Sequence, residues 1–262
     1  MVPNSSVGSR GRQPVACSVC NLSKICIPSG MQEDEIESLS SLVKRDRTIQ
    51  KNETIYHAGD RFTGIYALKS GSAKLVHTDR NGFESIIAIL LPGEILGFDG
   101  LSSGRYLCSL MALEPSSYCE LPSQDLEQRA QKTPAIQQAM LQRAGEQFDQ
   151  CIERIAVSQR SAEERLAKFL MDLSRRFHVR GFHADHFRLS LTRQEMGNHL
   201  GLALETVSRL LSRLEQLGLI SVRGKQIKIL NFDGLLKICG ESLDPVAIER
   251  DLTRIKQDNL LP

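Results

Sequence analysis

The sequence predicts an α+β fold in three successive parts: an N-terminal antiparallel β-barrel or jelly roll, a long helix, and a C-terminal winged helix-turn-helix. Three observations support this prediction. Short apolar or alternating runs separated by turn residues fill residues 47–122, an amphipathic helical tract follows from about residue 123, and residues 192–229 contain two helical patterns and a basic hairpin. With 262 residues, the chain suits one large or two ordinary domains.

We expect five segments along the chain. They are a tail with a cysteine-rich stretch (1–30), a β-barrel domain that opens with a short helix over 33–43 (31–134), a long helix (135–160), a winged helix-turn-helix domain (161–240) and a C-terminal tail (241–262). Residues 1–16 are rich in Ser, Gly and Arg and are expected to be disordered. A helix over 247–257 is a further expectation.

The barrel prediction depends on turn chemistry as well as on alternation. Ser70-Gly71 and Asn81-Gly82 separate runs that read as strands, and both dipeptides are typical of tight hairpin turns. About 75 residues of short strands with such turns between them favour an antiparallel barrel or jelly roll.

The long helix carries one narrow apolar stripe. Its members recur every three or four residues: Met140, Ala144, Phe148, Cys151 and Ile155. A stripe this narrow is typical of a coiled-coil seam between two copies, although packing against the chain's own barrel fits the pattern equally well. Gly145 lies within the helix and weakens it by about 1 kcal/mol.

Two helices and a turn follow near the C-terminus. Thr192 and Glu195 form a capping box that opens the first helix, Gly201 ends it, and the second helix has Val207 and Leu211 on its apolar face. The opposite face carries Glu205, Ser208, Arg209 and Ser212. The DNA major groove admits one such helix, and Arg and carboxylate side chains can read guanine and cytosine there. Two ordinary helices with a solvated charged face remain an alternative.

The charge distribution agrees with a nucleic-acid-binding C-terminal unit. Residues 161–240 contain thirteen Lys and Arg against eight Asp and Glu, although the whole chain has a net charge of only +2. Residues 220–229 alternate around the basic tip Arg223-Gly224-Lys225, which suits a phosphate contact.

Three of the seven cysteines, Cys17, Cys20 and Cys26, lie within ten residues. The chain has no apolar run long enough to span a membrane and no signal-peptide pattern, so we expect a cytoplasmic protein. In a reducing compartment, closely spaced cysteines indicate metal ligands or redox thiols rather than disulfides. Their spacing fits an iron-sulfur cluster and a structural zinc site equally well.

Motifs of enzymes are absent from the sequence. It contains no P-loop, no GxSxG elbow and no HExxH, and the cysteine spacing differs from that of radical iron-sulfur enzymes. We therefore expect a regulator or binding protein.

The order of barrel, long helix and winged helix-turn-helix resembles the CRP-FNR superfamily of bacterial transcription regulators. In detail the chain is similar to the FNR type, the fumarate and nitrate reduction regulators, from about Cys17 to Gly240. The resemblance is carried by Cys17-x2-Cys20-x5-Cys26, by Cys119 in SSYCELP, by AEERLAKFLMDLSRRF with the RGF after it, and by ETVSRLL.

This resemblance implies an oxygen-responsive transcription regulator. Its 4Fe-4S cluster would be held by Cys17, Cys20, Cys26 and Cys119, whereas Cys108, Cys151 and Cys239 have no place in the ligand set and are expected to be small buried residues. Glu205, Ser208 and Arg209 would read a TTGAT-like half-site as part of a homodimer on double-stranded DNA, with RNA polymerase as a further partner.

Two departures from the family's pattern concern the helices. Ala203 stands where relatives commonly have Ser or Thr as the N-cap of the recognition helix, a loss of about 1 kcal/mol. In the long helix, a stripe beside the apolar one contains Arg143, Gln147, Gln150 and Arg154. We expect charge repulsion along this stripe to weaken pairing of cluster-free chains, and cluster assembly to shift the helix and stabilise the dimer.

The superfamily also offers a cyclic-nucleotide receptor as an alternative function. Gly93-Glu94-x2-Gly97 resembles the start of its phosphate-binding cassette, but Arg105 is followed by Tyr106 rather than by Ser or Thr. Because a buried phosphate requires a paired cation and donor, we interpret Gly93 and Gly97 as turn residues.

Overall fold

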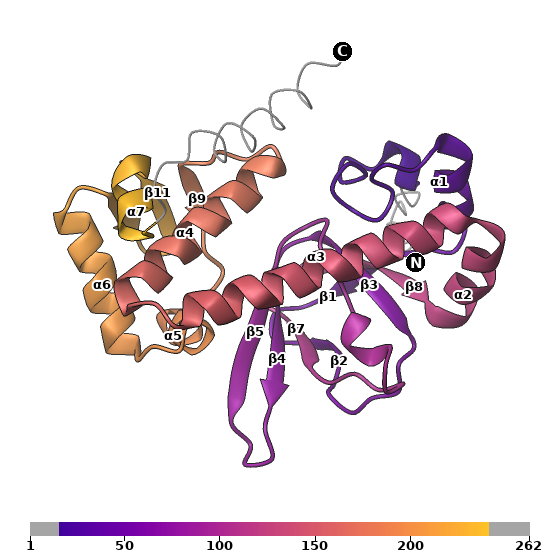
Figure 1. Ribbon diagram of the computed structural model, residues 1–262, viewed down its shortest axis with the longest axis horizontal. Coiled ribbons are helices and arrows are strands. Elements are labelled where there is room, and N and C mark those ends of the chain that lie inside the picture. The colour runs from indigo at the N-terminus through magenta and orange to yellow at the C-terminus, as the bar shows by residue number, and fades with distance from the viewer. Residues whose placement is uncertain (1–15, 241–262) are drawn as a thin grey trace, which may run out of the picture.

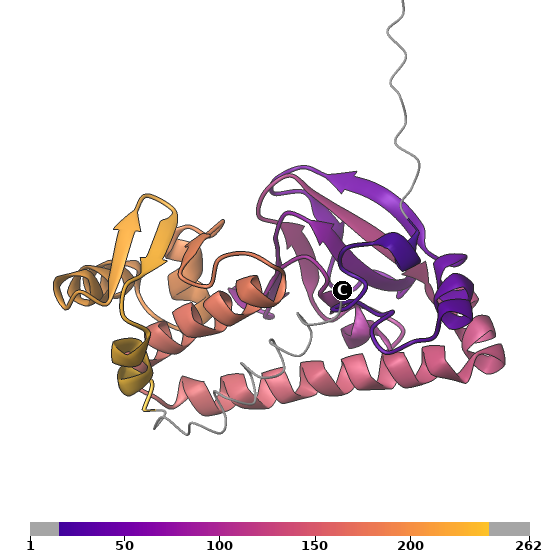
Figure 2. The same ribbon diagram turned by 90° about the horizontal axis from the view of Figure 1, so that it is seen from above.

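The computed structural model describes residues 16–240. The tails expected over 1–15 and 241–262, with the predicted helix over 247–257, lie outside the described residues. A long helix, α3 (Pro134–Ser158), runs alongside both the β-sheets and a C-terminal group of helices, which lie toward opposite ends of the molecule (Figure 1, Figure 2). The predicted fold class is confirmed.

The elements follow the predicted order. The N-terminal part contains η1 (Cys17–Val19), α1 (Glu33–Ser40), β1 (Lys44–Ile49), β2 (Thr54–Tyr56), β3 (Gly64–Ser70), β4 (Ala73–Thr78), β5 (Glu84–Leu90), β6 (Ile95–Leu96), η2 (Phe98–Gly100), β7 (Ser109–Ala112), β8 (Ser116–Pro122) and α2 (Ser123–Lys132). After α3 come α4 (Ala162–Val179), β9 (His186–Arg188), α5 (Arg193–Leu200), α6 (Leu204–Gln216), β10 (Ile220–Arg223), β11 (Gln226–Ile229) and α7 (Phe232–Ile238).

The N-terminal strands form two antiparallel sheets that enclose one core. Their strand orders are β1-β8-β3-β6 and β2-β7-β4-β5. Gly71 and Gly82 both have a positive φ, in the turns that join β3 to β4 and β4 to β5, which confirms the two predicted hairpins. Within the core, the rings of Tyr56 and Tyr106 stack with centroids 3.8 Å apart, and the ring centroid of Tyr66 lies 5.3 Å from that of Tyr56.

The barrel and the C-terminal helices share a continuous apolar core. Ile86, Ile89 and Leu113 from the barrel belong to the same buried cluster as Leu170 and Leu211. Polar contacts cross the same boundary. Lys74 pairs with Glu195 at 2.8 Å, and the Asn198 side chain accepts a hydrogen bond from the Ile86 backbone N–H at 2.6 Å. Helix α5, the first helix of the predicted helix-turn-helix, therefore packs against β5 through these hydrogen bonds.

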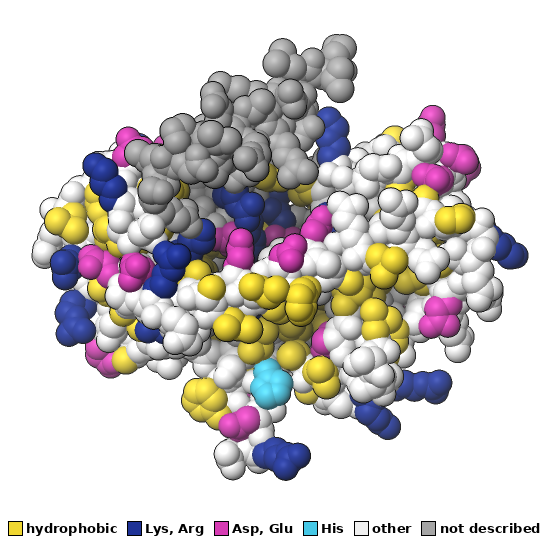
Figure 3. Space-filling model, in the orientation of Figure 1, with side chains coloured by type: hydrophobic (Ala, Val, Ile, Leu, Met, Phe, Trp, Pro, Cys, Tyr) yellow, Lys and Arg dark blue, Asp and Glu magenta, His cyan; other side chains and the backbone are white. Residues whose placement is uncertain are grey.

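Helix α3 leaves an apolar face in solvent. Leu141, Phe148, Ile152 and Ile155 are between 50% and 68% exposed, and Figure 3 shows hydrophobic side chains gathered over the middle of this helix. The predicted stripe is shifted by about one residue at its N-terminal end, because Met140 packs against the barrel core while Leu141 faces outward. Among the described residues, no helix is long and apolar enough to cross a membrane.

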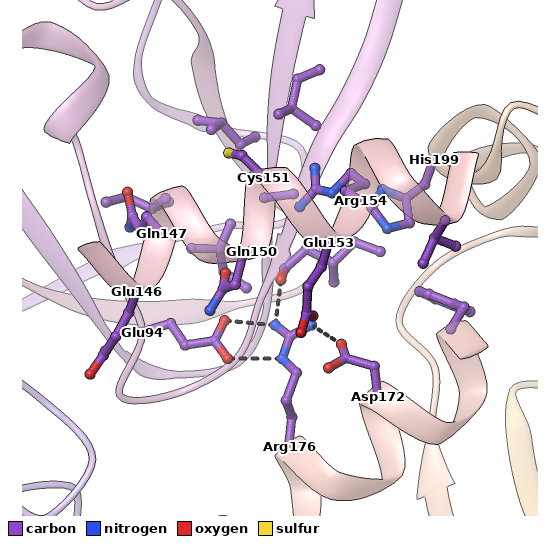
Figure 4. Close-up of a pocket in the computed structure, with 18 of the residues that line it drawn as sticks. Glu94, Glu146, Gln147, Gln150, Cys151, Glu153, Arg154, Asp172, Arg176 and His199 are labelled. Carbon is purple, nitrogen blue, oxygen red and sulfur yellow. Dashed lines mark hydrogen bonds and ion pairs between the residues drawn. The ribbon is translucent and has the colours of Figure 1, made fainter. Parts of the chain in front are cut away.

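The polar stripe of α3 faces the chain's own body, so the predicted charge repulsion between partner helices is wrong. Arg143 donates to the Cys26 carbonyl at 2.8 Å, and Gln147 donates to the Ile95 carbonyl. Arg154 lines a cavity of about 320 Å³ between the barrel, α3 and α4 (Figure 4). These side chains fix the side of α3 that turns inward, and the apolar face consequently turns outward.

Candidate functional site

The cysteine-rich segment folds into tight turns rather than into a long element. Cys17 begins η1, and its backbone N–H donates to the Ser40 hydroxyl at 3.2 Å. Further turns follow, with the N–H of Cys26 donating to the Leu22 carbonyl at 2.9 Å. Successive turns of this kind bring three cysteines from ten residues of sequence to one side of the segment.

The fourth cysteine of the expected set comes from the barrel. Cys119 lies in β8 opposite Ala67 of β3, and its side chain is half-buried. All four cysteines line one small cavity of about 40 Å³, together with apolar side chains such as Leu22, Leu39 and Leu121. The structure therefore brings Cys17, Cys20, Cys26 and Cys119 together, although Cys26 and Cys119 are 93 positions apart in the sequence.

The four thiols lie among apolar side chains, and a charge on one of them affects the ionisation of its neighbours. Burial, opposed by a hydrogen bond from the Ile27 backbone and assisted by the charges of Cys119, Cys17 and Cys20, raises the pKa of the Cys26 thiol to about 12. Thiols in such a site favour the neutral form until a cation compensates their charge. Bound metal would supply that compensation.

Among the described residues, no group of candidate metal ligands is arranged around a single point. A tetrahedral zinc site needs its ligands about 2.3 Å from one ion, and within residues 16–240 no group of three or more His, Cys, Asp or Glu side chains meets such a geometry. Four cysteine thiolates can hold either a zinc ion or an iron-sulfur cluster.

The remaining cysteines fall into two environments. Cys108 and Cys239 are buried in the barrel core and the C-terminal core, as expected. Cys151 is exposed on α3, so the expectation that it is buried is wrong. Cys151 lines the wide cavity between the barrel, α3 and α4, so its side chain stays accessible to solvent.

The helix-turn-helix forms as its sequence predicts. The Thr192 hydroxyl accepts from the Glu195 N–H at 3.1 Å, while the Glu195 carboxylate accepts from the Thr192 N–H at 2.8 Å. Gly201 ends α5 with φ 65°, and a Cβ on Gly197 would lie 2.5 Å from the Leu202 carbonyl oxygen. Glycine at both positions allows the two helices to approach closely.

The outward face of α6 carries the expected polar side chains. Glu205 and Arg209 are exposed, Ser208 is half-buried, and Val207, Leu211 and Leu214 anchor the opposite face. Within the described chain, neither Glu205 nor Arg209 has an ion-pair partner. Ala203, the N-cap of α6, makes no side-chain hydrogen bond, because an alanine side chain has no acceptor.

The hairpin after α6 has a third strand that the sequence pattern missed. β9 pairs with β11, and β11 pairs with β10. The one sign of β9 in the sequence is the alternating triplet His186-Phe187-Arg188, in which Phe187 is buried. Arg223 is exposed at the tip, whereas Lys225 donates to the Ser190 carbonyl at 2.7 Å. Arg223 is thus the more available phosphate contact of the two.

The sequence pattern also missed the ion pairs between the barrel and α4. Glu94 accepts from Arg176 at 2.7 Å, and Arg176 also pairs with Asp172 (Figure 4). The same Glu94 carboxylate accepts from Arg180 at 2.6 Å. Glu94 holds the pKa of Arg176 above its usual value, although burial opposes this shift. The basic residues of SRRF and RGF were the available signal, but their partner lies more than 80 residues away.

The barrel interior differs from a nucleotide pocket at the position of the cassette. Tyr106 is buried and its hydroxyl donates to the Gly64 carbonyl at 2.7 Å, while the Arg105 guanidinium is on the surface and donates to the Gly59 carbonyl at 2.7 Å. Gly93 and Gly97 have φ values of 89° and 102°, which confirms them as turn residues.

Comparison with known proteins agrees with this architecture. Residues 164–238 match the Crp-like helix-turn-helix domain and residues 46–133 match the cyclic nucleotide-binding domain. The chain is 38% identical over 235 residues to the anaerobic regulatory protein of Haemophilus influenzae, covering 89% of this chain and 91% of that protein. It is also 38% identical over 246 residues to the fumarate and nitrate reduction regulatory protein of Escherichia coli K12, covering 92% and 98%.

Among solved structures, FixK2 from Bradyrhizobium japonicum is similar with a TM-score of 0.68 and 26% sequence identity, covering 74% of this chain and 96% of FixK2. The fold and the helix-turn-helix together define a DNA-binding transcription regulator. The chain belongs to the Crp/Fnr family, in the group of the fumarate and nitrate reduction regulators. Its relatives are regulators and not enzymes, which agrees with the sequence-based expectation.

Proposed function

We propose that this chain is an oxygen-responsive transcription regulator that binds DNA as a homodimer when a 4Fe-4S cluster is bound by Cys17, Cys20, Cys26 and Cys119. The observation that carries the proposal is the convergence of these four cysteines on one cavity, from a surface segment and a barrel strand. Two relatives named for anaerobic regulation and for fumarate and nitrate reduction support the physiological setting.

The chemistry of the donor set fits such a cluster. Four thiolates are the usual ligands of a 4Fe-4S cluster, which supplies an iron-sulfur centre that oxygen can destroy. The protein's part is to hold the four thiolates and to enclose them with apolar side chains. Three ligands come from the η1 segment, so cluster assembly would pin that segment to β8, and cluster loss would release it.

In this proposal, side chains of α6 recognise the DNA bases. Arg209 can donate to guanine O6 and N7, and Glu205 can accept from cytosine N4, with Ser208 between them on the same face. These contacts suit a TTGAT-like half-site, repeated about one helical turn away by the second subunit. The exposed apolar face of α3 would be buried between the two subunits. RNA polymerase is the proposed further partner at promoters.

A cyclic-nucleotide receptor remains the competing hypothesis, because residues 46–133 match that domain type. The structure favours the cluster hypothesis for a physical reason. Tyr56, Tyr66 and Tyr106 fill the barrel core near the cassette, and Arg105 is engaged at the surface. The five segments given above remain the proposed domain division.

The test is anaerobic reconstitution of the full-length chain with iron and sulfide. We expect about four iron and four sulfide per chain, a brown colour that bleaches in air, and tight DNA binding in the loaded form alone. Cys119→Ala should abolish colour and tight binding, and Cys151→Ala is the matched control. A colourless, zinc-loaded protein whose DNA binding ignores air, or responds to added cyclic AMP, would contradict the proposal.

A further inference from the structure

Arg143 makes a direct contact between the dimerisation helix and a cysteine of the candidate cluster site. One terminal nitrogen of its guanidinium donates to the Cys26 carbonyl at 2.8 Å. The other pairs with Glu146 at 2.7 Å, one turn along α3. The Arg143 side chain is only 16% exposed, so the guanidinium is held in a fixed position between its two acceptors.

The acceptor depends on the fold of the cysteine segment. The Cys26 carbonyl already accepts the Ser29 backbone N–H at 3.1 Å, and the second lone pair points to Arg143. That geometry exists only while residues 22–29 keep their turns. If the segment leaves the barrel, Arg143 loses this acceptor and keeps only Glu146.

A second contact seats the same segment against the barrel beside α3. A Cβ added to Gly93 would lie 2.9 Å from the Ile25 side chain, so only glycine allows Ile25 to approach this turn. Two residues further, the Ile95 carbonyl accepts from Gln147 of α3. The cysteine segment, the 93–95 turn and the inner face of α3 therefore form one packed junction.

We propose that Arg143 is a positioning residue that communicates the folded state of the cysteine segment to α3. This inference rests on the proposed function and names the residue that links its sensing and dimerising parts. With the segment pinned, Arg143 fixes the rotation of α3 so that Leu141, Phe148 and Ile152 face the second subunit. With the segment released, the Arg143 guanidinium loses the Cys26 carbonyl, and this rotation of α3 is no longer enforced.

Arg143→Met tests the link, since Met keeps an unbranched apolar stem and lacks the guanidinium. We expect the reconstituted variant to contain as much iron and sulfide as wild type and to have the same absorbance spectrum. Its dimer dissociation constant, from anaerobic sedimentation velocity, should rise about ten-fold, the usual effect of losing one charge-assisted hydrogen bond. Arg143→Lys should restore part of the loss, because one ammonium can still donate to the carbonyl.

The matched control is Arg129→Met on α2, whose guanidinium contacts the Ser41 hydroxyl at 3.4 Å on the surface. It should dimerise as wild type does. In the cluster-loaded proteins, amide hydrogen exchange over residues 22–29 should be faster in Arg143→Met than in Arg129→Met, because only the first variant loses the contact with the Cys26 carbonyl. A loaded Arg143→Met variant that dimerises like wild type would overturn the link alone. A wild-type chain that takes up no iron would overturn the proposed function and, with it, the link.

Discussion

Glu94 of the barrel pairs with Arg176 of α4 at 2.7 Å, across the boundary between the barrel and the C-terminal DNA-binding part. The same carboxylate holds Arg180 at 2.6 Å, and the Arg180 side chain is only 6% exposed. One acidic side chain thus fixes the last turn of α4 and its C-cap, at the end of the helix that leads into the DNA-reading unit. The orientation of that unit in the described chain depends on this cluster as well as on the shared apolar core.

We expect Glu94→Gln to lower the free energy of unfolding by about 2 kcal/mol, because two partly buried guanidinium groups lose their anionic acceptor. Urea unfolding followed by circular dichroism measures the change. Arg175→Gln is the control, since Arg175 is 56% exposed and its pair with Asp172 should contribute little. Equal losses in the two variants would contradict the assigned role of Glu94.

Phe148→Asp should weaken self-association of the loaded protein at least ten-fold. Phe148 is 67% exposed on α3, and burial of such a side chain between subunits contributes about 1.5–3 kcal/mol. Sedimentation velocity gives the dissociation constant. Phe83→Asp, at an equally exposed phenyl group on the β4–β5 turn, should leave it unchanged. A greater effect of Phe83→Asp would place the subunit contact elsewhere.

Arg209→Ala should cost about 1–3 kcal/mol of binding free energy on the specific site and relax the preference at one guanine. Arg223→Ala, at the exposed wing, should weaken binding to specific and random DNA alike, as expected of a phosphate contact. Fluorescence anisotropy on both DNA types separates the two outcomes. If Arg209→Ala weakened binding to both DNA types equally, Arg209 would be a backbone contact.

Ala203→Ser should stabilise the C-terminal unit by about 1 kcal/mol. Ala203 has φ −68° and ψ 150°, the extended conformation of an N-cap, and lacks only a side-chain acceptor for the first turn of α6. Thermal unfolding measures the gain, and Ala203→Val, which offers no acceptor, is the control. An unchanged or lowered melting temperature in Ala203→Ser would show that the first turn is already satisfied.

We expect the free energy of unfolding to fall in acid, because the folded chain resists protonation of the buried His199 side chain. Burial lowers the pKa of His199 from 6.5 to about 4, assisted by the charges of Arg154 and Arg176 and opposed by a hydrogen bond with the Ile86 carbonyl and by the charge of Asp172. As pH falls below 6.5 the unfolded chain gains a proton that the folded chain takes up only near pH 4. The folded state is therefore destabilised progressively through this window.

His199→Asn can keep a donor for the Ile86 carbonyl without titrating. We expect its free energy of unfolding to vary less with pH than that of wild type between neutral pH and the acid end of the window. Urea titrations at both ends measure the difference. Parallel pH profiles would assign the acid sensitivity to other groups.

Local chemistry in the sequence determined the elements and much of the DNA-binding surface. The Thr192–Glu195 capping box, Gly201 and the apolar spacing around Val207 each depend on neighbours a few residues away, so the bounds of α5 and the outward face of α6 follow from the sequence pattern. The hairpin glycines, Gly71 and Gly82, likewise specify their own turns. For the same local reason, the three closely spaced cysteines marked their segment as a candidate ligand site.

Only the tertiary structure decided which side of α3 faces inward. The sequence placed Arg143 and Arg154 beside a partner helix, because a helical stripe contains no information about what packs on it. The fold brings the Cys26 carbonyl to Arg143 and turns Cys151 into solvent. It also brings Cys119 to the N-terminal cysteines and Glu94 to Arg176, across separations of more than 80 residues. Such contacts depend on which distant segments the fold brings side by side. Local periodicity and residue spacing do not contain that information.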